Sequence, residues 1–261
     1  MEFSTIEVTH RGSRGAITLD RPDKLNPLGT ATLLELVEAA GYLDSIAGVK
    51  VVVVSGRGRA FSAGADLAAF SGEGGSAPSA SVSREAADAG RRMADAIEAM
   101  RAVTVARIQG HCVGGGLVLA AACDLRVAAD DVRFSIPEID LGIPLAWGGI
   151  PRLVREIGPA LTKELVMTCR PFSAAEAKAA GFLNRVVPAA ELDAAVEALA
   201  AQLESKSALT LAATKRHTNS VAEGMVGTAR SWNDADSLVT ALRDPESRSV
   251  AAAYLDRFRR R

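Results

Sequence analysis

The run Val49–Val54 constrains the fold most strongly, because five of its six residues are valine. Valine is β-branched and favours extended backbone, and a nearly continuous apolar run is typical of a strand buried on both faces. Further apolar runs at 15–19, 104–108 and 124–128 predict three more strands. A sheet buried on both faces must be covered by other elements, so helices are expected around it.

Helical patterns lie between these strands. Residues 31–47 carry apolar side chains at helical spacing, and Thr30 stands where an N-cap is needed. Residues 117–122 are apolar and helix-prone, and they follow the glycines 114–116. Strands that alternate with helices indicate an α/β fold rather than a β-sandwich.

The sequence pattern changes from alternating strands and helices to helices alone near residue 189. No strand pattern follows residue 189, and four helices are predicted, at 190–206, 208–221, 225–242 and 245–259. We therefore predict two parts, an α/β core at 1–195 and a helical region at 196–261.

The segment 71–81 is rich in glycine, serine and alanine. Loops of this length inside a compact domain are usually lids, binding loops or disordered stretches. We expect this segment to be mobile and to help form the wall of a binding pocket.

Composition excludes several classes of protein. The 30 Lys and Arg residues nearly balance the 31 Asp and Glu residues, which argues against a dedicated nucleic-acid binder. The three cysteines form no CxxC pair and the three histidines are scattered, so neither a disulfide framework nor a metal site is expected. No apolar stretch of about 18 residues predicts a membrane span, and the N-terminus does not resemble a signal peptide. These features favour a cytoplasmic protein.

Common catalytic motifs are also missing. The sequence contains neither a GxxxxGK[ST] phosphate loop nor a GxSxG nucleophile elbow. The stretch Gly56–Phe61 comes nearest to a dinucleotide fingerprint, but phenylalanine replaces its third glycine. A nicotinamide enzyme therefore remains only a weak alternative.

Two turns rich in small residues follow predicted strands, at 60–67 and 110–116. Glycine lets a ligand approach the backbone, and a helix N-terminus presents N–H groups without partners. Two such turns, if they converge, would offer two donors to one oxyanion. From the residues alone, plain tight turns are an equally good interpretation.

Six stretches together resemble the enoyl-CoA hydratase/isomerase (crotonase) family, in its order and spacing. They are Arg21–Leu28, Phe61–Leu67, Gly114–Leu125, Phe134–Gly142, Gly148–Leu153 and Ala174–Pro188. The resemblance implies a spiral of ββα units with a C-terminal helical oligomerisation region, assembled as a homotrimer or a dimer of trimers. It also implies an acyl-CoA substrate, whose thioester oxygen would accept hydrogen bonds from the amides of Ala65 and Gly115.

Coenzyme A is part of such a substrate, so no separate cofactor and no metal are expected. The resemblance places five residues along the coenzyme A path. They are Lys24, Leu25, Ala63, Asp66 and Leu67. A solvated lysine is the alternative for Lys24, and a turn-stabilising carboxylate is the alternative for Asp66.

The catalytic carboxylates depart from the family pattern. Glu138 matches the second of the two glutamates of the hydratases, and its apolar neighbours predict burial and a raised pKa. The first glutamate is replaced by Val118, and a further acid of the dienoyl-CoA isomerases falls on Ala146. One acid/base residue suffices for double-bond isomerisation, which we slightly favour. A 2-enoyl-CoA hydratase that uses one glutamate and a non-catalytic acyl-CoA binder remain alternatives.

Other polar and aromatic residues have less specific interpretations. We expect His111 to be a buried histidine rather than a cleft residue. Asp140 would share a face with Glu138 only if the strand continued. Trp147 is expected in the core or in the wall of an acyl pocket, and Cys112 and Cys123 are expected to be small buried residues.

Overall fold

The computed structural model describes residues 2–66 and 80–259, without the side chains of 80–82 and 258–259. Leu67 and residues 71–79 of the segment expected to be mobile lie outside the described residues.

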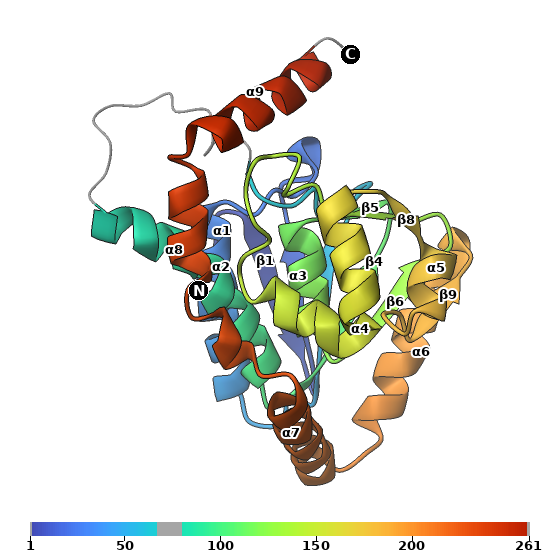
Figure 1. Cartoon of the computed structure of the whole chain (residues 1–261). Helices are drawn as coiled ribbons and strands as arrows, with labels where there is room; N and C mark the ends of the chain where they lie inside the picture. Colours follow the sequence, from blue (N-terminus) through green and yellow to red (C-terminus); the bar gives the residue numbers. More distant parts are fainter. Residues whose placement is uncertain (1, 67–79, 260–261) are drawn as a thin grey trace.

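A six-stranded sheet forms the centre of the protein (Figure 1). Its first two strands are antiparallel, and every later pairing is parallel. In spatial order the strands are β1 (Ile6–Arg11), β2 (Arg14–Leu19), β3 (Val51–Gly56), β4 (Val103–Ile108), β6 (Leu125–Ala129) and β9 (Arg185–Val187). The four predicted strands are confirmed as β2, β3, β4 and β6. The edge strands β1 and β9 were not predicted, because β1 is largely exposed and β9 has only three residues.

The valine run lies in the middle of this sheet, as its composition predicts. β3 pairs with β2 on one side and β4 on the other. Val51, Val52 and Val54 are fully buried. Leu43 of the first helix covers the sheet beside Val52, where Gly15 leaves room for it.

A second, smaller sheet consists of three short strands, two of which directly follow strands of the main sheet in the sequence. It consists of β5 (His111–Val113), β7 (Arg133–Ser135) and β8 (Phe172–Ser173). The chain passes from β4 to β5 and from β6 to β7, and a helix follows each pair. This is the predicted succession of ββα units. Phe134 holds the small sheet to the core, because its ring stacks on Phe172 at 5.3 Å and meets Phe182 edge-on.

Six helices pack around the sheets. They are α1 (Thr30–Ser45), α2 (Ala80–Ala99), α3 (Gly115–Ala122), α4 (Gly149–Thr168), α5 (Ala174–Ala179) and α6 (Leu192–Glu204). The sequence analysis predicted α1, α3 and α6 but not α2, α4 or α5. The side chains that α2 buries are Ala89, Met93, Ala94 and Ile97. No helix in the described part of the chain is long and apolar enough to cross a membrane.

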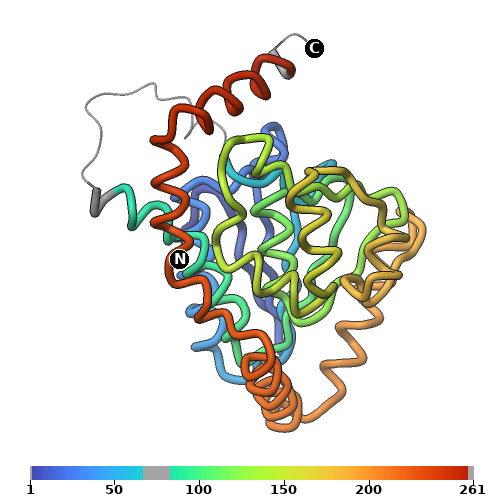
Figure 2. Tube along the Cα trace, in the orientation of Figure 1, coloured from blue at the N-terminus to red at the C-terminus, as the bar shows by residue number. Residues whose placement is uncertain are grey.

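The remaining helices extend beyond the sheets (Figures 1 and 2). They are α7 (Ala208–Met225), α8 (Asp234–Ala241) and α9 (Pro245–Arg259). The prediction of one helix over 225–242 is wrong, because the backbone leaves the helical region at Val226 and a short 3-10 turn at 228–231 precedes α8. The predicted boundary at 195 falls inside α6, and the buried side chains of α6 belong to the main core.

Candidate active site

The two small-residue turns lie side by side. The Ser62 amide donates to the His111 carbonyl at 3.1 Å, and the Val113 amide donates to the Ser62 carbonyl at 3.0 Å. Gly64 has a φ of +89°, and a Cβ there would lie 2.7 Å from the Val113 carbonyl oxygen. Only glycine therefore allows the two turns to approach this closely.

Ala65 and Gly115 line one cavity at the meeting point of these turns. Gly115 is the first residue of α3, so its amide has no acceptor within the helix. Neither the Ala65 amide nor the Gly115 amide donates to another residue that the structure describes. The structure thus brings the two predicted donor residues to the same cavity, although 50 positions separate them.

Glu138 lies in the same cavity, just after the end of β7. Its side chain packs over the bare Cα of Gly114, where a Cβ would lie under 3.0 Å from Glu138 Oε1. The residue is 8% exposed, and its Oε2 has no hydrogen-bond partner among the described residues. Burial raises the pKa of this carboxyl to about 7, as the apolar sequence context predicts.

The cavity measures about 30 Å³, and Glu138 is the single ionisable side chain among its described lining residues. The positions of both missing family acids, Val118 and Ala146, belong to this lining. The wall is otherwise apolar and is completed by Ile143, Pro144, Leu145, Trp147 and Leu238. The site therefore presents one carboxyl group in an apolar pocket.

The residues predicted along the coenzyme A path lie beside the first turn. The Ala63 amide donates to the Leu25 carbonyl at 2.8 Å, and Asp66 forms an ion pair with Arg21 at 3.3 Å. Lys24 is exposed. The ion pair supports the interpretation of Asp66 as a residue that stabilises the turn.

Asn26 is the residue whose importance the sequence analysis missed. It is 1% exposed, and its Nδ2 donates to the carbonyls of Arg57, Ala60 and Phe61. Its Oδ1 accepts from the Arg21 amide at 3.0 Å. The available signal in the sequence was an asparagine between Pro22 and Pro27, because asparagine is one of the few residues that readily adopt a positive φ, here 55°.

Two of the less specific predictions are settled by the local backbone. The prediction of a buried His111 is wrong: in β5 Cys112 points into the core, so its neighbour His111 faces solvent. Asp140 is exposed, because the chain turns after Glu138 and the Gly142 amide donates to the Ile139 carbonyl. Cys112 and Cys123 are buried as predicted, and burial raises the pKa of both thiols.

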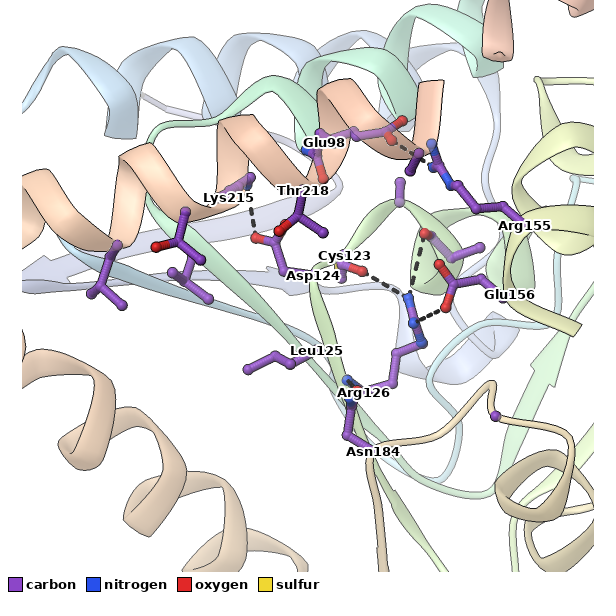
Figure 3. A pocket seen from close by; sticks show the side chains of 18 of the residues that line it. Glu98, Cys123, Asp124, Leu125, Arg126, Arg155, Glu156, Asn184, Lys215 and Thr218 are labelled. Atoms are coloured by element: carbon purple, nitrogen blue, oxygen red, sulfur yellow. Dashed lines mark hydrogen bonds and ion pairs between the residues drawn. The ribbon is translucent and has the colours of Figure 1, made fainter. Parts of the chain in front are cut away.

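A larger cavity of about 650 Å³ lies between α7 and the end of α3 (Figure 3). Six of the seven charged side chains among its described lining residues form ion pairs: Arg126 with Glu156 at 2.5 Å, Arg155 with Glu98 at 2.5 Å, and Lys215 with Asp124 at 2.7 Å. The pairs of Arg126 and Lys215 join α4 and α7 to the start of β6, and the pair of Arg155 joins α4 to α2. We therefore place the candidate site at Glu138 rather than in this cavity.

The fold is shared with crotonase-type proteins. The crystal structure of an enoyl-CoA hydratase from Mycobacterium avium subsp. paratuberculosis superposes with a TM-score of 0.86 at 27% identity, over 97% of this chain and 99% of that one. Residues 11–259 match the sequence model of the family described as enoyl-CoA hydratase/isomerase. The chain belongs to the enoyl-CoA hydratase/isomerase family.

Two relatives with different descriptions are similar to this chain. A probable enoyl-CoA hydratase of Mycobacterium tuberculosis is 34% identical over 251 residues, which cover 90% of this chain and 91% of the relative. A peroxisomal Δ(3,5)-Δ(2,4)-dienoyl-CoA isomerase of Arabidopsis thaliana is 33% identical over 224 residues, which cover 82% and 81%. Both a hydratase and an isomerase are thus similar to this protein.

Proposed function

We propose that this protein is an acyl-CoA enzyme in which Glu138 is the single acid/base residue, and that double-bond isomerisation is its favoured reaction. The observation that carries the proposal is that Glu138, with a pKa of about 7, is the one ionisable group among the described residues of a cavity also lined by Ala65 and Gly115. A carboxyl group of this pKa exchanges protons readily near neutral pH. The amides of Ala65 and Gly115 would stabilise negative charge on the thioester oxygen.

The proposed isomerisation needs no second acid. Glu138 removes a proton from C2 of a 3-enoyl-CoA, and the electron pair spreads onto the thioester oxygen and C4. The protonated Glu138 then returns the proton to C4, while the double bond moves from C3–C4 to C2–C3. The two transfers are sequential, so one carboxyl group performs both.

Hydration of a 2-enoyl-CoA is the second candidate reaction, because a similar protein is described as a probable hydratase. One group must then take a proton from water while another proton reaches C2. Val118 and Ala146 supply no acid at the cavity, which disfavours this reaction. The absence of these acids also motivates the non-catalytic acyl-CoA binder as a third candidate.

Replacement of Glu138 tests the proposal directly. With 3-enoyl-CoA and 2-enoyl-CoA substrates assayed in parallel, we expect faster turnover of the 3-enoyl thioester by the natural protein. Glu138→Gln should lower kcat by about 10²- to 10⁴-fold, the usual contribution of a general acid/base residue, and should still bind saturated acyl-CoA. The exposed Glu38→Gln is the matched control. Full activity of Glu138→Gln would refute the assigned role, and acyl-CoA binding without any turnover would favour the non-catalytic binder.

We further propose that the chain assembles as a homotrimer or a dimer of trimers. Large apolar side chains are exposed on and after α7: Leu209 and Met225 are each 74% exposed, and Trp232 is 72% exposed. Exposed apolar groups that gather in one region often mark an interface. Sedimentation velocity should give a mass of three or six chains, and a monomer at micromolar concentration would contradict the assembly.

A further inference from the structure

Trp147 occupies an unusual place beside the candidate site. Its backbone lies in the left-handed region, with a φ of 63°, and its indole is half-buried between α2 and α3. A Cβ at Gly90 of α2 or at Gly115 of α3 would come under 3.0 Å from the indole ring. The indole therefore fits only because both helices present a glycine to it.

The indole lies between two cavities. The cavity of about 30 Å³ that contains Glu138 is lined by Trp147, and so is a neighbouring cavity of about 260 Å³. The larger cavity lies among the starts of α1 and α2 and the end of α8, and it shares Ala65, Trp147 and Leu238 with the smaller one. Together they approach the lower size limit of small-molecule pockets, about 300 Å³.

The backbone beside Trp147 is held from two sides. The Gly148 amide donates to Asp234 Oδ2 at 2.8 Å, and the Gly148 carbonyl accepts from Arg152 Nη1 at 3.3 Å. Arg152 is fully buried and also pairs with Asp95 and Glu98. These contacts fix the backbone on the C-terminal side of Trp147. We therefore expect the two cavities to join only if the indole side chain itself moves.

We propose that Trp147 limits the length of the acyl group, and that this protein prefers short-chain acyl-CoA thioesters. A group held beside Ala65, Gly115 and Glu138 meets the indole after its first few carbons. A longer chain needs the outer cavity, which the indole separates from the carboxyl group. This inference rests on the proposed function, because it assumes an acyl-CoA ligand.

Removal of the indole tests the inference. Binding of butanoyl-, octanoyl- and dodecanoyl-CoA is measured by calorimetry, and kcat/KM is measured for enoyl-CoA substrates of the same lengths. We expect the natural protein to prefer the four-carbon ligand, and Trp147→Gly to raise the ratio of long- to short-chain affinity at least tenfold. Trp147→Phe should lie between them, and Trp232→Phe, at the only other tryptophan, should match the natural protein.

Two results would overturn the inference. One is equal affinity of the natural protein for all three chain lengths, and the other is an unchanged ratio in a folded Trp147→Gly variant. Binding separates this test from the proposed enzyme activity: a length preference without turnover would refute the activity and still support the role of Trp147. If no acyl-CoA bound, both would be refuted.

Gly90→Ala tests the contact between the Trp147 indole and Gly90 of α2 and leaves Glu138 unchanged. Alanine usually stabilises a helix relative to glycine. In the natural protein we expect Gly90→Ala to lower the melting temperature, because its methyl group meets the indole. In the Trp147→Gly background the same change should raise the melting temperature. An increase in both backgrounds would show that the indole does not lie against Gly90.

Discussion

Glu138 shows how one residue acquires its chemistry from its surroundings. Its carboxyl group is buried beside Gly114, Oε2 has no partner among the described residues, and burial raises its pKa to about 7. A charged carboxylate is costly in such a place, so the proton is held more tightly than in water. The same burial suits Glu138 to proton transfer near neutral pH, and it also means that the ionised form of Glu138 destabilises the folded state.

The first prediction at this scale concerns the rate. If Glu138 accepts the C2 proton, its carboxylate form is the active one, so kcat/KM should fall about tenfold per pH unit below pH 7 and level off above it. A pH profile from 5.5 to 8.5 with a 3-enoyl-CoA measures this. A midpoint near the ordinary glutamate pKa would contradict the prediction.

The second prediction concerns stability. The folded pKa of about 7 exceeds the ordinary value of 4.5, so the folded state binds this proton more tightly than the unfolded state. The contribution of Glu138 to stability therefore decreases as pH rises from 4.5 to 7, to a penalty of roughly 3 kcal/mol above pH 7. Urea unfolding should show Glu138→Gln to be more stable than the natural protein at pH 8 and nearly equal to it at pH 4. Equal stability at both pH values would count against a buried, unpartnered carboxyl group.

At the scale of the elements, hydrogen bonds from two other segments fix the turn at 61–65, which carries Ala65. The turn at 61–65 is held against β5 by backbone hydrogen bonds, and Asn26 ties it to the preceding turn. Ser62 adds a further link, because its hydroxyl donates to the Asn26 carbonyl at 2.8 Å and accepts from the Gly64 amide at 3.1 Å. The position of Ala65 thus depends on two turns that are separate in the sequence.

Removal of the Asn26 side chain should destabilise the turn at 61–65. Asn26→Ala leaves the Phe61 carbonyl without its side-chain donor and removes one of the two side-chain donors to the Ala60 carbonyl, so we expect a loss of roughly 1–3 kcal/mol in the free energy of unfolding. The value of kcat/KM should also fall, because the Ala65 amide loses its support. Asn233→Ala, at an exposed position without a side-chain cap, should change stability by less than about 0.5 kcal/mol. Equal effects of the two substitutions would refute the proposed support.

At the scale of the whole molecule, a buried ion pair joins α7 to the sheet (Figure 3). Lys215 Nζ lies 2.7 Å from Asp124 Oδ2 and donates to the Ala102 carbonyl at 3.0 Å. Lys215 is 8% exposed, and Asp124 also accepts from the amide and the hydroxyl of Thr104. The start of the outer helices is therefore fixed to β4 and β6 by charge as well as by packing.

Loss of one partner should detach this helix. Lys215→Met leaves Asp124 without its cation, and breaking a buried pair costs about 3–5 kcal/mol. Arg84→Ala removes an ion pair with Asp236 in which both side chains are about half exposed, so it should cost less than about 1 kcal/mol. Urea denaturation of the two variants gives the comparison, and a small effect of Lys215→Met would show that packing alone holds α7.

The sequence by itself determined the elements and several local environments. The valine run predicts a central strand, the alternation of patterns predicts an α/β fold, and the apolar neighbours of Glu138 predict its burial. These features are local, because the periodicity of a segment records which of its faces is covered. The helix expected over 225–242 is interrupted, because the backbone is no longer helical at Val226 and a 3-10 turn at 228–231 follows.

Only the tertiary structure decided which residues from distant parts of the sequence lie side by side. It brought Ala65 to Gly115, turned His111 to solvent beside a buried Cys112, and placed the Trp147 indole between Gly90 and Gly115. No single segment encodes these distances, because each depends on how helices and strands from several parts of the chain pack together. A glycine in the sequence signals that something comes close to the backbone, and the packed fold alone shows which group it is.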